Sequence, residues 1–304
     1  MEHPLRIAAP LVAPLKSGGP VVAFETTILS FGLPRPANRE VADACEGAAR
    51  EAGAIPATVA LLDGQVCAGL SDEEIDFFCT SDPSIMKINL QNFSLALARR
   101  KPGALTVATT MKACAMAGIR VFATGGIGGV HRGFAETLDI SSDLKALAEF
   151  PVAVICAGAK SVLDVPATLE VLETLGVPVV GYRTKCFPRF FCPDSPHQLD
   201  ASFDDMAELA AFARVHFETC RGGILVVTPV PQADAIAGPE MDVWIDKALA
   251  EAHQQGVSGK AVTPFLLSRL KDLSGGRTLA ANRALITNNA TVASQLAVAL
   301  SSKP

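Results

Sequence analysis

Short apolar runs alternate with amphipathic stretches along this chain. Such runs are typical of strands that are covered on both faces, and helices fit between them. The pattern predicts an α/β fold with helices packed on both faces of a mainly parallel sheet. The predicted strands are Val21–Phe24, Thr58–Leu62, Leu105–Ala108, Val121–Ala123, Val152–Cys156, Val179–Gly181 and Ile224–Thr228.

Helix boundaries are marked by capping residues. Asn38–Gly53 starts at an asparagine suited to capping and stops at a glycine, and Thr168–Leu175 and Asp204–Thr219 repeat this scheme. The tail, Leu285–Leu300, is predicted to form a last helix. Asp63-Gly64 between two apolar runs predicts a hairpin, so we expect a mixed sheet with an antiparallel part.

The composition is typical of a compact protein, with 304 residues, of which 49% are hydrophobic and 19% charged. No internal repeat or long linker divides the sequence, which predicts one domain over residues 1–304 with residues 1–19 as an N-terminal extension. The net charge is −5 and the longest basic run is Arg99-Arg100-Lys101. These features argue against a nucleic-acid partner and favour a small substrate.

The eight cysteines form no CxxC pair, and several lie inside apolar runs, as reduced buried thiols do in the cytosol. The N-terminal segment has an acid at position 2 and prolines within its apolar stretch, so it resembles neither a signal peptide nor an anchor. No apolar run reaches the length of about 18 residues that a membrane span needs. We therefore expect a cytoplasmic protein with no membrane partner.

Polar residues that follow the apolar runs are candidates for chemistry, since reactive groups gather at the carboxyl ends of parallel strands. Lys160 follows one such run and has no acid within three residues, so its amine is poorly solvated, which suits an imine-forming nucleophile. The alternative is a lysine that extends to solvent. Glu25 follows four apolar residues, where burial favours a general acid or base. Its alternative is an acid that caps the next helix.

A glycine-rich loop follows Val121–Ala123. Its glycines allow tight turns that aim backbone N–H groups inward, and His131 and Arg132 add donors, so the loop suits a phosphate. The sequence is neither a dinucleotide-binding GxGxxG in the usual register nor a P-loop. The alternative is a flexible connector without a ligand. The glycines are Gly125, Gly126, Gly128 and Gly129.

Three acids behind this loop, Glu136, Asp139 and Asp143, are spaced three and four residues apart. On one helical turn they would share a face and hold a hard cation through carboxylate oxygens or water. Helix capping is the alternative explanation. The five histidines show no zinc-ligand spacing.

Nine features in this order resemble the pseudouridine-5'-phosphate glycosidases, also called the indigoidine synthase A-like family. The similarity runs from about residue 20 to 300, and the fourth and sixth features are highly specific to the family. The features are "ETTILSFGLPRPAN", Lys87, "TVATTM", "TGGIGGVHRG", "DISSDL", "CAGAKSVLD", "FFCPDSP", "GKAVTPFLL" and "NNATVASQLA".

The resemblance implies a three-layer α/β/α sandwich with a central mixed sheet, assembled as a homotrimer. It implies an enzyme that makes or breaks the C–C bond between C1 of ribose 5-phosphate and a carbon of uracil. Lys160 would form an imine at C1, and Glu25 would exchange a proton with the base carbon. Hydrolysis of the imine would release ribose 5-phosphate.

By matching position, Asp139 is expected to bind a divalent metal, Mn²⁺, with waters completing the shell. Lys87 and His131 would bind the 5'-phosphate, and Asn282 the base. The further expected substrate contacts are Val107, Thr110, Ser141, Ser142 and Asp143. Asn288 and Asn289 are expected to cap the final helix.

Two departures from the family pattern make the approach to the site less polar. Phe31 stands where the family generally has histidine, and residues 88–93 after Lys87 replace a polar run. Such surroundings suit a larger aromatic acceptor than uracil. The alternative function is therefore a C-glycosynthase that attaches ribose 5-phosphate to an aromatic natural product. A second alternative is a non-catalytic sugar-phosphate sensor, which would be marked by loss of Lys160 or Glu25, and neither is lost.

Overall fold

The computed structural model describes residues 4–80, 82–257 and 262–302. Its main sheet has eleven strands, with the path β1-β4-β3-β2-β7-β9-β13-β11-β12 and with β6 pairing β3 and β5. The strands are β1 Leu5–Ile7, β2 Val21–Phe24, β3 Ile55–Leu62, β4 Gln65–Ala68, β5 Met86–Ile88, β6 Gly103–Leu105, β7 Val121–Ala123, β9 Ala153–Cys156, β11 Val179–Tyr182, β12 Ala201–Phe203 and β13 Ile224–Val227. A second, two-stranded sheet pairs β8 Val130–His131 with β10 Leu163–Asp164.

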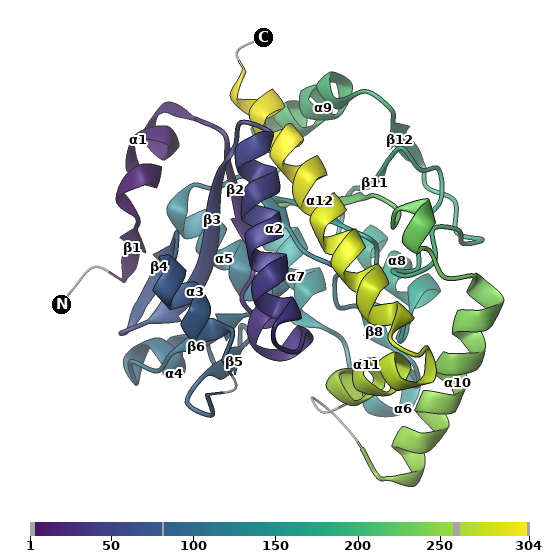
Figure 1. Ribbon diagram of the computed structural model, residues 1–304. Helices are drawn as coiled ribbons and strands as arrows, with labels where there is room; N and C mark the ends of the chain where they lie inside the picture. The colour runs from purple at the N-terminus through teal and green to yellow at the C-terminus, as the bar shows by residue number, and fades with distance from the viewer. Residues whose placement is uncertain (1–3, 81, 258–261, 303–304) are drawn as a thin grey trace.

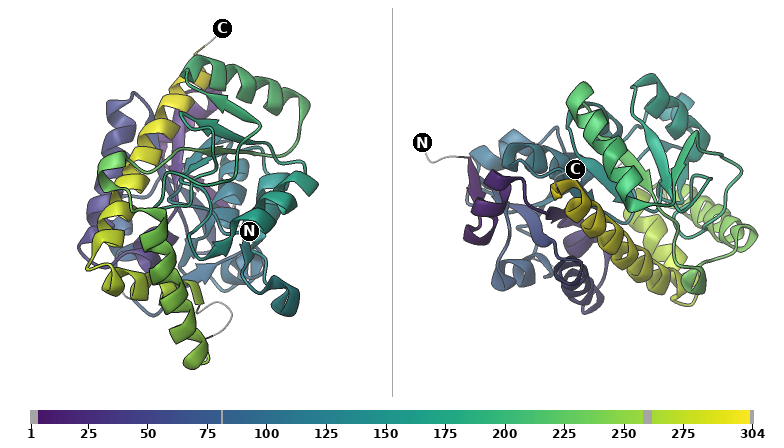
Figure 2. Two further views of the ribbon diagram at one scale, coloured as in Figure 1. Left: turned by 90° about the vertical axis from the view of Figure 1, so that its right-hand side faces the viewer. Right: turned by 90° about the horizontal axis from the view of Figure 1, so that it is seen from above.

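Helices cover both faces of the main sheet. In Figure 1, α12 in yellow runs alongside α2 over one face, whereas α5 and α7 pack together behind the sheet. Figure 2 shows the same layers from the side and from above. The helices are α1 Ala9–Ser17, η1 Ile28–Gly32, α2 Ala37–Glu51, α3 Asp72–Phe78, α4 Phe93–Ala98, α5 Val107–Ala117, α6 Phe134–Thr137, α7 Ser142–Glu149, α8 Val165–Thr174, α9 Met206–Thr219, η2 Gln232–Asp234, α10 Gly238–Gln254, α11 Val262–Leu273 and α12 Arg277–Ser301.

The predicted fold class is confirmed, because the sheet is mixed, mostly parallel and covered on both faces. The consecutive pairs from β3 through β2, β7, β9 and β13 to β11 are all parallel. Strand β3 pairs antiparallel with β6 and with β4, and the pair with β4 is the predicted hairpin, in which Leu62 pairs with Gln65. Its turn residues Asp63 and Gly64 have φ of 50° and 78°, the left-handed values that such a tight turn requires.

Several predicted boundaries are wrong, among them the start of the helix predicted at Thr168, which begins at Val165. The predicted strand Leu105–Ala108 is divided, since β6 ends at Leu105 and α5 starts at Val107. A short apolar run cannot tell a buried strand from the buried face of a helix. The last helix starts at Arg277, so Asn288 and Asn289 lie inside it and do not cap it.

The N-terminus of α2 also differs from its prediction. The helix begins at Ala37, and Asn38 lies in its first turn. Its side-chain amide donates to the carbonyl oxygens of Leu29 and Cys79, at 2.8 and 2.9 Å. Asn38 therefore fastens η1 and the end of α3 to α2 and does not cap the helix.

The segment predicted as an N-terminal extension contributes to the fold. Its strand β1 pairs in parallel with β4, and α1 follows. Within the described residues, no helix combines the length and the hydropathy that crossing a membrane would require.

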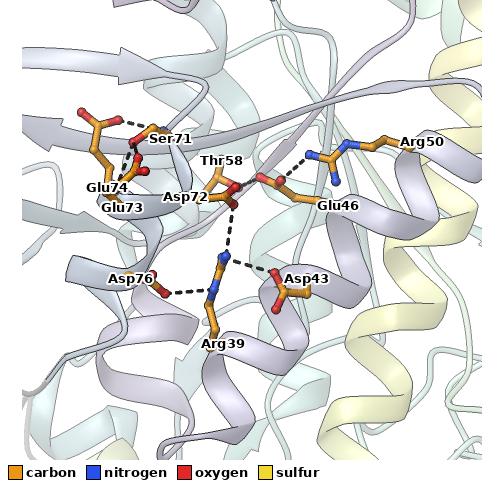
Figure 3. A network of polar contacts seen from close by, with 10 residues as sticks. All are labelled: Arg39, Asp43, Glu46, Arg50, Thr58, Ser71, Asp72, Glu73, Glu74 and Asp76. Atoms are coloured by element: carbon orange, nitrogen blue, oxygen red, sulfur yellow. Dashed lines mark hydrogen bonds and ion pairs between the residues drawn. The ribbon is translucent and has the colours of Figure 1, made fainter.

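A charged network joins α2 to α3 on the outside of the sheet (Figure 3). Arg39 on α2 forms ion pairs with Asp43, Asp72 and Asp76, at 3.3, 3.1 and 3.0 Å. One guanidinium shared by three carboxylates holds the two helices in register more firmly than an isolated surface pair would.

Candidate active site

Three neighbouring parallel strands end at the candidate site. In register, Phe24 of β2 lies beside Ala123 of β7, which lies beside Ile155 of β9. The residues that follow these strands therefore meet at one edge of the sheet. Glu25 follows β2, Thr124 follows β7, and the turn to Lys160 follows β9.

The turn after β9 brings Lys160 to this edge. Gly158 has φ of 87°, and a Cβ there would lie 2.1 Å from the carbonyl oxygen of Pro188, so only glycine fits. The backbone N–H of Lys160 donates to the carbonyl of Ile127 at 3.1 Å. Lys160 is half-buried, and its charge acts on Glu25.

Glu25 is 7% exposed, and both of its carboxylate oxygens accept hydrogen bonds. Thr27 donates to Oε2 and Thr124 donates to Oε1. Burial raises the pKa of Glu25 above its ordinary value of 4.5; the charge of Lys160 and the two hydroxyl donors lower it, and Asp143 raises it. The net direction is upward, which favours a carboxyl that holds a proton to higher pH than an exposed glutamate. Glu25 caps no described helix, since η1 begins at Ile28 after Thr27.

Asp143 is a second buried carboxylate, 5% exposed, in the first turn of α7. Its Oδ1 accepts from the N–H of Ala108 at 2.9 Å and its Oδ2 from the N–H of Gly128 at 2.8 Å. The side chain thus fastens the glycine-rich loop to the N-terminus of α5. It is a charged group close to Glu25 that is held by backbone donors.

The three acids do not share a helical face, so that prediction is wrong. Glu136 belongs to α6 and Asp143 to α7, and Leu138 between them has φ of 54°, which ends α6. Asp139 lies in the connection between the two helices. The left-handed residue breaks the helical spacing that the sequence suggested.

The glycine-rich loop is closely packed, and three of its backbone N–H groups already have partners within the protein. A Cβ on Gly128 would lie 2.3 Å from Ser141 Oγ, and one on Gly126 would lie 2.6 Å from the ring of Phe190. The N–H groups of Ile127, Gly128 and Val130 donate to partners within the protein. These donors are therefore not available to an anion.

Two asparagines of α12 lie against the same loop. Asn289 is fully buried, and its amide donates to the carbonyls of Thr124 and Gly125, at 2.8 and 3.3 Å. Sequence reasoning missed this role, because it depends on how α12 packs over β7. The Oδ1 of Asn282 lies 3.6 Å from the position of a Cβ on Gly125 and has no hydrogen-bond partner in the described part of the chain.

The predicted phosphate and metal residues are more exposed than Glu25. Lys87 lies exposed on β5, beside β6, whose last residue Leu105 accepts a hydrogen bond from Thr27. The Nδ1 of His131 lies 3.9 Å from Oδ2 of Asp139, whose side chain is 43% exposed. Among residues 4–80, 82–257 and 262–302, no group of three or more His, Cys, Asp or Glu side chains is arranged to bind a metal.

The remaining predicted substrate contacts differ in burial. Ser141 and Ser142 are half-buried at the start of α7, where Ser141 caps the helix by accepting from the N–H of Asp143 at 3.2 Å. Val107 and Thr110 are buried in α5. The Thr110 hydroxyl has no partner among the described residues.

A cavity of about 360 Å³ lies next to the site and does not contain Glu25 or Lys160. It is lined by Ser161, Leu163, Asp164, Arg132, Arg189 and residues of α8 and α10, among others. Ser161 and Arg132 adjoin Lys160 and His131 in sequence, so the cavity borders the candidate site.

Comparison with known proteins extends over almost the whole chain. Residues 11–299 match the sequence model of the family described as indigoidine synthase A like protein. The chain is 49% identical to a pseudouridine-5'-phosphate glycosidase from Myxococcus xanthus, covering 97% of this chain and 98% of that protein. It is 52% identical to a protein of the same name from Methylobacterium nodulans, covering 99% and 89%.

A solved structure is similar over the same length. The prealnumycin C-glycosynthase AlnA, in complex with ribulose 5-phosphate, superposes with a TM-score of 0.91 at 36% identity, covering 99% of this chain and 98% of that one. The superposition covers 99% of this chain and therefore includes the strands β2 and β9, which Glu25 and Lys160 follow.

Proposed function

The chain belongs to the indigoidine synthase A-like protein family, and from this premise we propose that it is a pseudouridine-5'-phosphate glycosidase. The enzyme makes or breaks the C–C bond between C1 of ribose 5-phosphate and a carbon of uracil. The observation that carries this proposal is the identity of 49% with a glycosidase over 98% of that protein's length, in a chain that keeps Glu25 and Lys160.

In the cleavage direction, the Lys160 amine bonds to C1, the bond from C1 to the ring oxygen breaks, and the proton that the nitrogen loses passes to that oxygen, which becomes a hydroxyl. Glu25 then gives its proton to the base carbon, the C–C bond breaks, and the nitrogen lone pair forms the C1=N bond of the imine. Water hydrolyses the imine, which restores the amine and releases ribose 5-phosphate. The buried carboxyl of Glu25 suits the acid step because burial raises its pKa.

Asp139 is the residue that would hold the divalent ion of this proposal. One half-exposed carboxylate, without a cluster of further ligands in the described residues, fits a hydrated hard cation such as Mn²⁺ or Mg²⁺. An ion there would supply positive charge beside the oxygens of the sugar phosphate. His131 and Lys87 contribute the protein's own donors to that half of the site.

The proposal is tested by incubating the protein with Mn²⁺, ribose 5-phosphate and uracil and measuring pseudouridine 5'-phosphate by mass spectrometry. The expected result is product with the unaltered protein and none with Lys160→Ala. Lack of product, under conditions in which ribose 5-phosphate binding is measured by calorimetry, would remove this function.

A second candidate is attachment of ribose 5-phosphate to a larger aromatic acceptor. Two observations favour it: the similarity to a C-glycosynthase, and Phe31, which is 43% exposed on η1 shortly after Glu25. An aromatic side chain at that position offers a stacking surface to a ring system. Product formation with prealnumycin as the acceptor and not with uracil would select this candidate. A non-catalytic sensor is disfavoured, because the nucleophile and the acid are both present.

We also propose that the chain forms a homotrimer in the cytoplasm. Large apolar side chains are exposed at Leu138 and Val243, at 73% and 66%, and burial of such residues favours association. Light scattering coupled to gel filtration is expected to give three times the mass of 31.7 kDa. A monomer mass would contradict this part of the proposal.

A further inference from the structure

The two oxygens of Glu25 face two threonine hydroxyls that differ in one respect. Thr124 contacts Oε1 and has no second hydrogen-bond acceptor in the described part of the chain. Thr27 contacts Oε2 and also lies 3.0 Å from the carbonyl oxygen of Leu105. Both threonines are at least nine-tenths buried, so water does not compete freely for these contacts.

A hydroxyl has one proton and can therefore serve only one of two acceptors at a time. When Glu25 is ionised, Thr27 donates to Oε2 and gives up the carbonyl of Leu105. When Glu25 carries a proton on Oε2, it donates to Thr27, and Thr27 donates to Leu105. The second arrangement satisfies all three groups, whereas the hydroxyl of Thr124 donates to Oε1 in both states.

We propose that Thr27 is a positioning residue that holds the acidic proton of Glu25 on Oε2 and changes its acceptor when that proton is transferred. The inference deepens the proposed function and rests on it. Transfer of the proton to the base carbon leaves a carboxylate, and rotation about the Cβ–Oγ bond of Thr27 moves its hydrogen from Leu105 to Oε2. No heavy atom has to move, which is the condition for a preorganised site.

Neighbouring groups fix the charge around this exchange. The charged groups that act on Glu25 are Lys160 and Asp143, and Asp143 is held by the N–H groups of Ala108 and Gly128. Thr26, the residue between Glu25 and Thr27, accepts from the N–H of Leu105 and donates to the carbonyl of Val59, both at 2.9 Å. Leu105 is thereby held against the end of β2, where its carbonyl can serve Thr27.

The test compares Thr27→Val with Thr124→Val, which have the same change in shape. The pKa of Glu25 is measured by NMR on protein labelled with ¹³C at the glutamate carboxyl, and the signal is assigned by its loss in Glu25→Gln. Thr124→Val removes a donor only, so we expect the pKa to rise by about one pH unit. Thr27→Val removes a donor to the ionised carboxylate and also an acceptor for the protonated carboxyl. We therefore expect the pKa of Glu25 to change by less than about half a pH unit. Equal rises in the two variants would overturn the proposal.

Thr27→Ser provides the rescue, because it keeps the hydroxyl. We expect the pKa of Glu25 and kcat to return to the unaltered values, whereas Thr27→Val lowers kcat with little change in KM. A serine variant that behaves like the valine variant would contradict the proposal. If Thr27→Val does not fold, as judged by thermal unfolding, Thr27→Ala is measured in the same way.

The NMR measurement does not depend on turnover. Suppose that the protein shows no C-glycoside activity, but that Thr124→Val raises the pKa of Glu25 more than Thr27→Val does. This result would contradict the proposed function and would support the role proposed for Thr27. C-glycoside activity together with equal changes in the pKa of Glu25 in the two valine variants would support the proposed function and contradict the role proposed for Thr27.

Discussion

The part of the site around Glu25, its proposed acid half, and the part around Asp139 and His131, its proposed phosphate half, are built differently. Around Glu25, each oxygen has a protein donor, and Asp143 is held by two backbone N–H groups. Around Asp139, the corresponding carboxylate is 43% exposed and its described ion-pair partner is His131 at 3.9 Å. In the first region, the carboxylate oxygens have hydrogen-bond donors from the protein itself. In the second region, the carboxylate is partly exposed and could accept contacts from a ligand.

The difference follows from where each region lies in the fold. Glu25 directly follows a core strand whose neighbours are fixed by sheet register, so its environment is set when the sheet forms. Asp139 lies between two short helices outside the sheet. The proposed function would thus place proton transfer in the rigid part and binding of a charged, hydrated ligand in the exposed part.

The largest effect expected in the acid half follows loss of the amine. Lys160→Ala and Lys160→Arg should each lower kcat by on the order of 10⁴-fold or more, because neither provides a nucleophilic amine. Arginine keeps the charge next to Glu25, so it separates charge from nucleophilicity. Steady-state kinetics measure the loss, and substantial turnover by the arginine variant would argue against an imine.

In the phosphate half, Asp139→Ala should act mainly on binding. Loss of one charged contact costs about 1.5–3 kcal/mol, which corresponds to a rise of roughly 10- to 100-fold in KM or in the metal concentration required. The unfolding temperature should change little, because the side chain is half-exposed and its described contact is one ion pair of 3.9 Å with His131. Asp139→Asn serves as the matched control for size. A large fall in stability would show that the two halves are not built differently.

Gly128→Ala tests the contact by which Asp143 fastens the glycine-rich loop to α5. The added Cβ would lie 2.3 Å from Ser141 Oγ and 2.8 Å from Asp143 Oδ2, so these two side chains must shift. We expect a loss of about 1–3 kcal/mol in the free energy of unfolding, measured with denaturant. Gly47→Ala in α2 is the control, because its Cβ meets nothing within 4 Å, and it should be neutral or stabilising. Equal stability of the two variants would contradict the close packing described for Gly128.

The smallest effect concerns the pH dependence of stability. Because the pKa of Glu25 in the folded protein is raised above 4.5, the folded state keeps its proton to higher pH than the unfolded state. Its contribution to stability is therefore complete below pH 4.5 and is lost as pH rises through the folded pKa. Glu25→Gln mimics the protonated form. The unfolding temperature of this variant minus that of the unaltered protein should therefore increase as pH rises. A difference that stays constant with pH would contradict the shift.

The sequence predicted the regions that depend on local pattern. The bounds of β2 and β7 agree with the predicted runs Val21–Phe24 and Val121–Ala123, because a buried parallel strand is a continuous apolar run. The position of Glu25 followed from the first of these runs, and that of Lys160 followed from the run Val152–Cys156. The division of Leu105–Ala108 between β6 and α5 did not, since four apolar residues suit either element.

Contacts between distant segments could not be predicted from the pattern. Asn289 reaches Thr124 across 165 residues of sequence, and the partner of Asp143 at Ala108 is 35 residues away. The glycines were predicted to form a phosphate nest, because glycine signals conformational freedom as readily as close packing. Only the positions of Phe190 and Ser141 show that this loop needs space for its neighbours.

The central claim is that the amine of Lys160, next to a buried acid, bonds to C1 of ribose 5-phosphate. Its most direct test is borohydride reduction of the protein with ribose 5-phosphate, followed by peptide mass spectrometry. A reduced sugar-phosphate adduct on Lys160, also formed by Glu25→Gln and absent from Lys160→Arg, is the expected result. Adducts spread over surface lysines, with none on Lys160, would contradict the account.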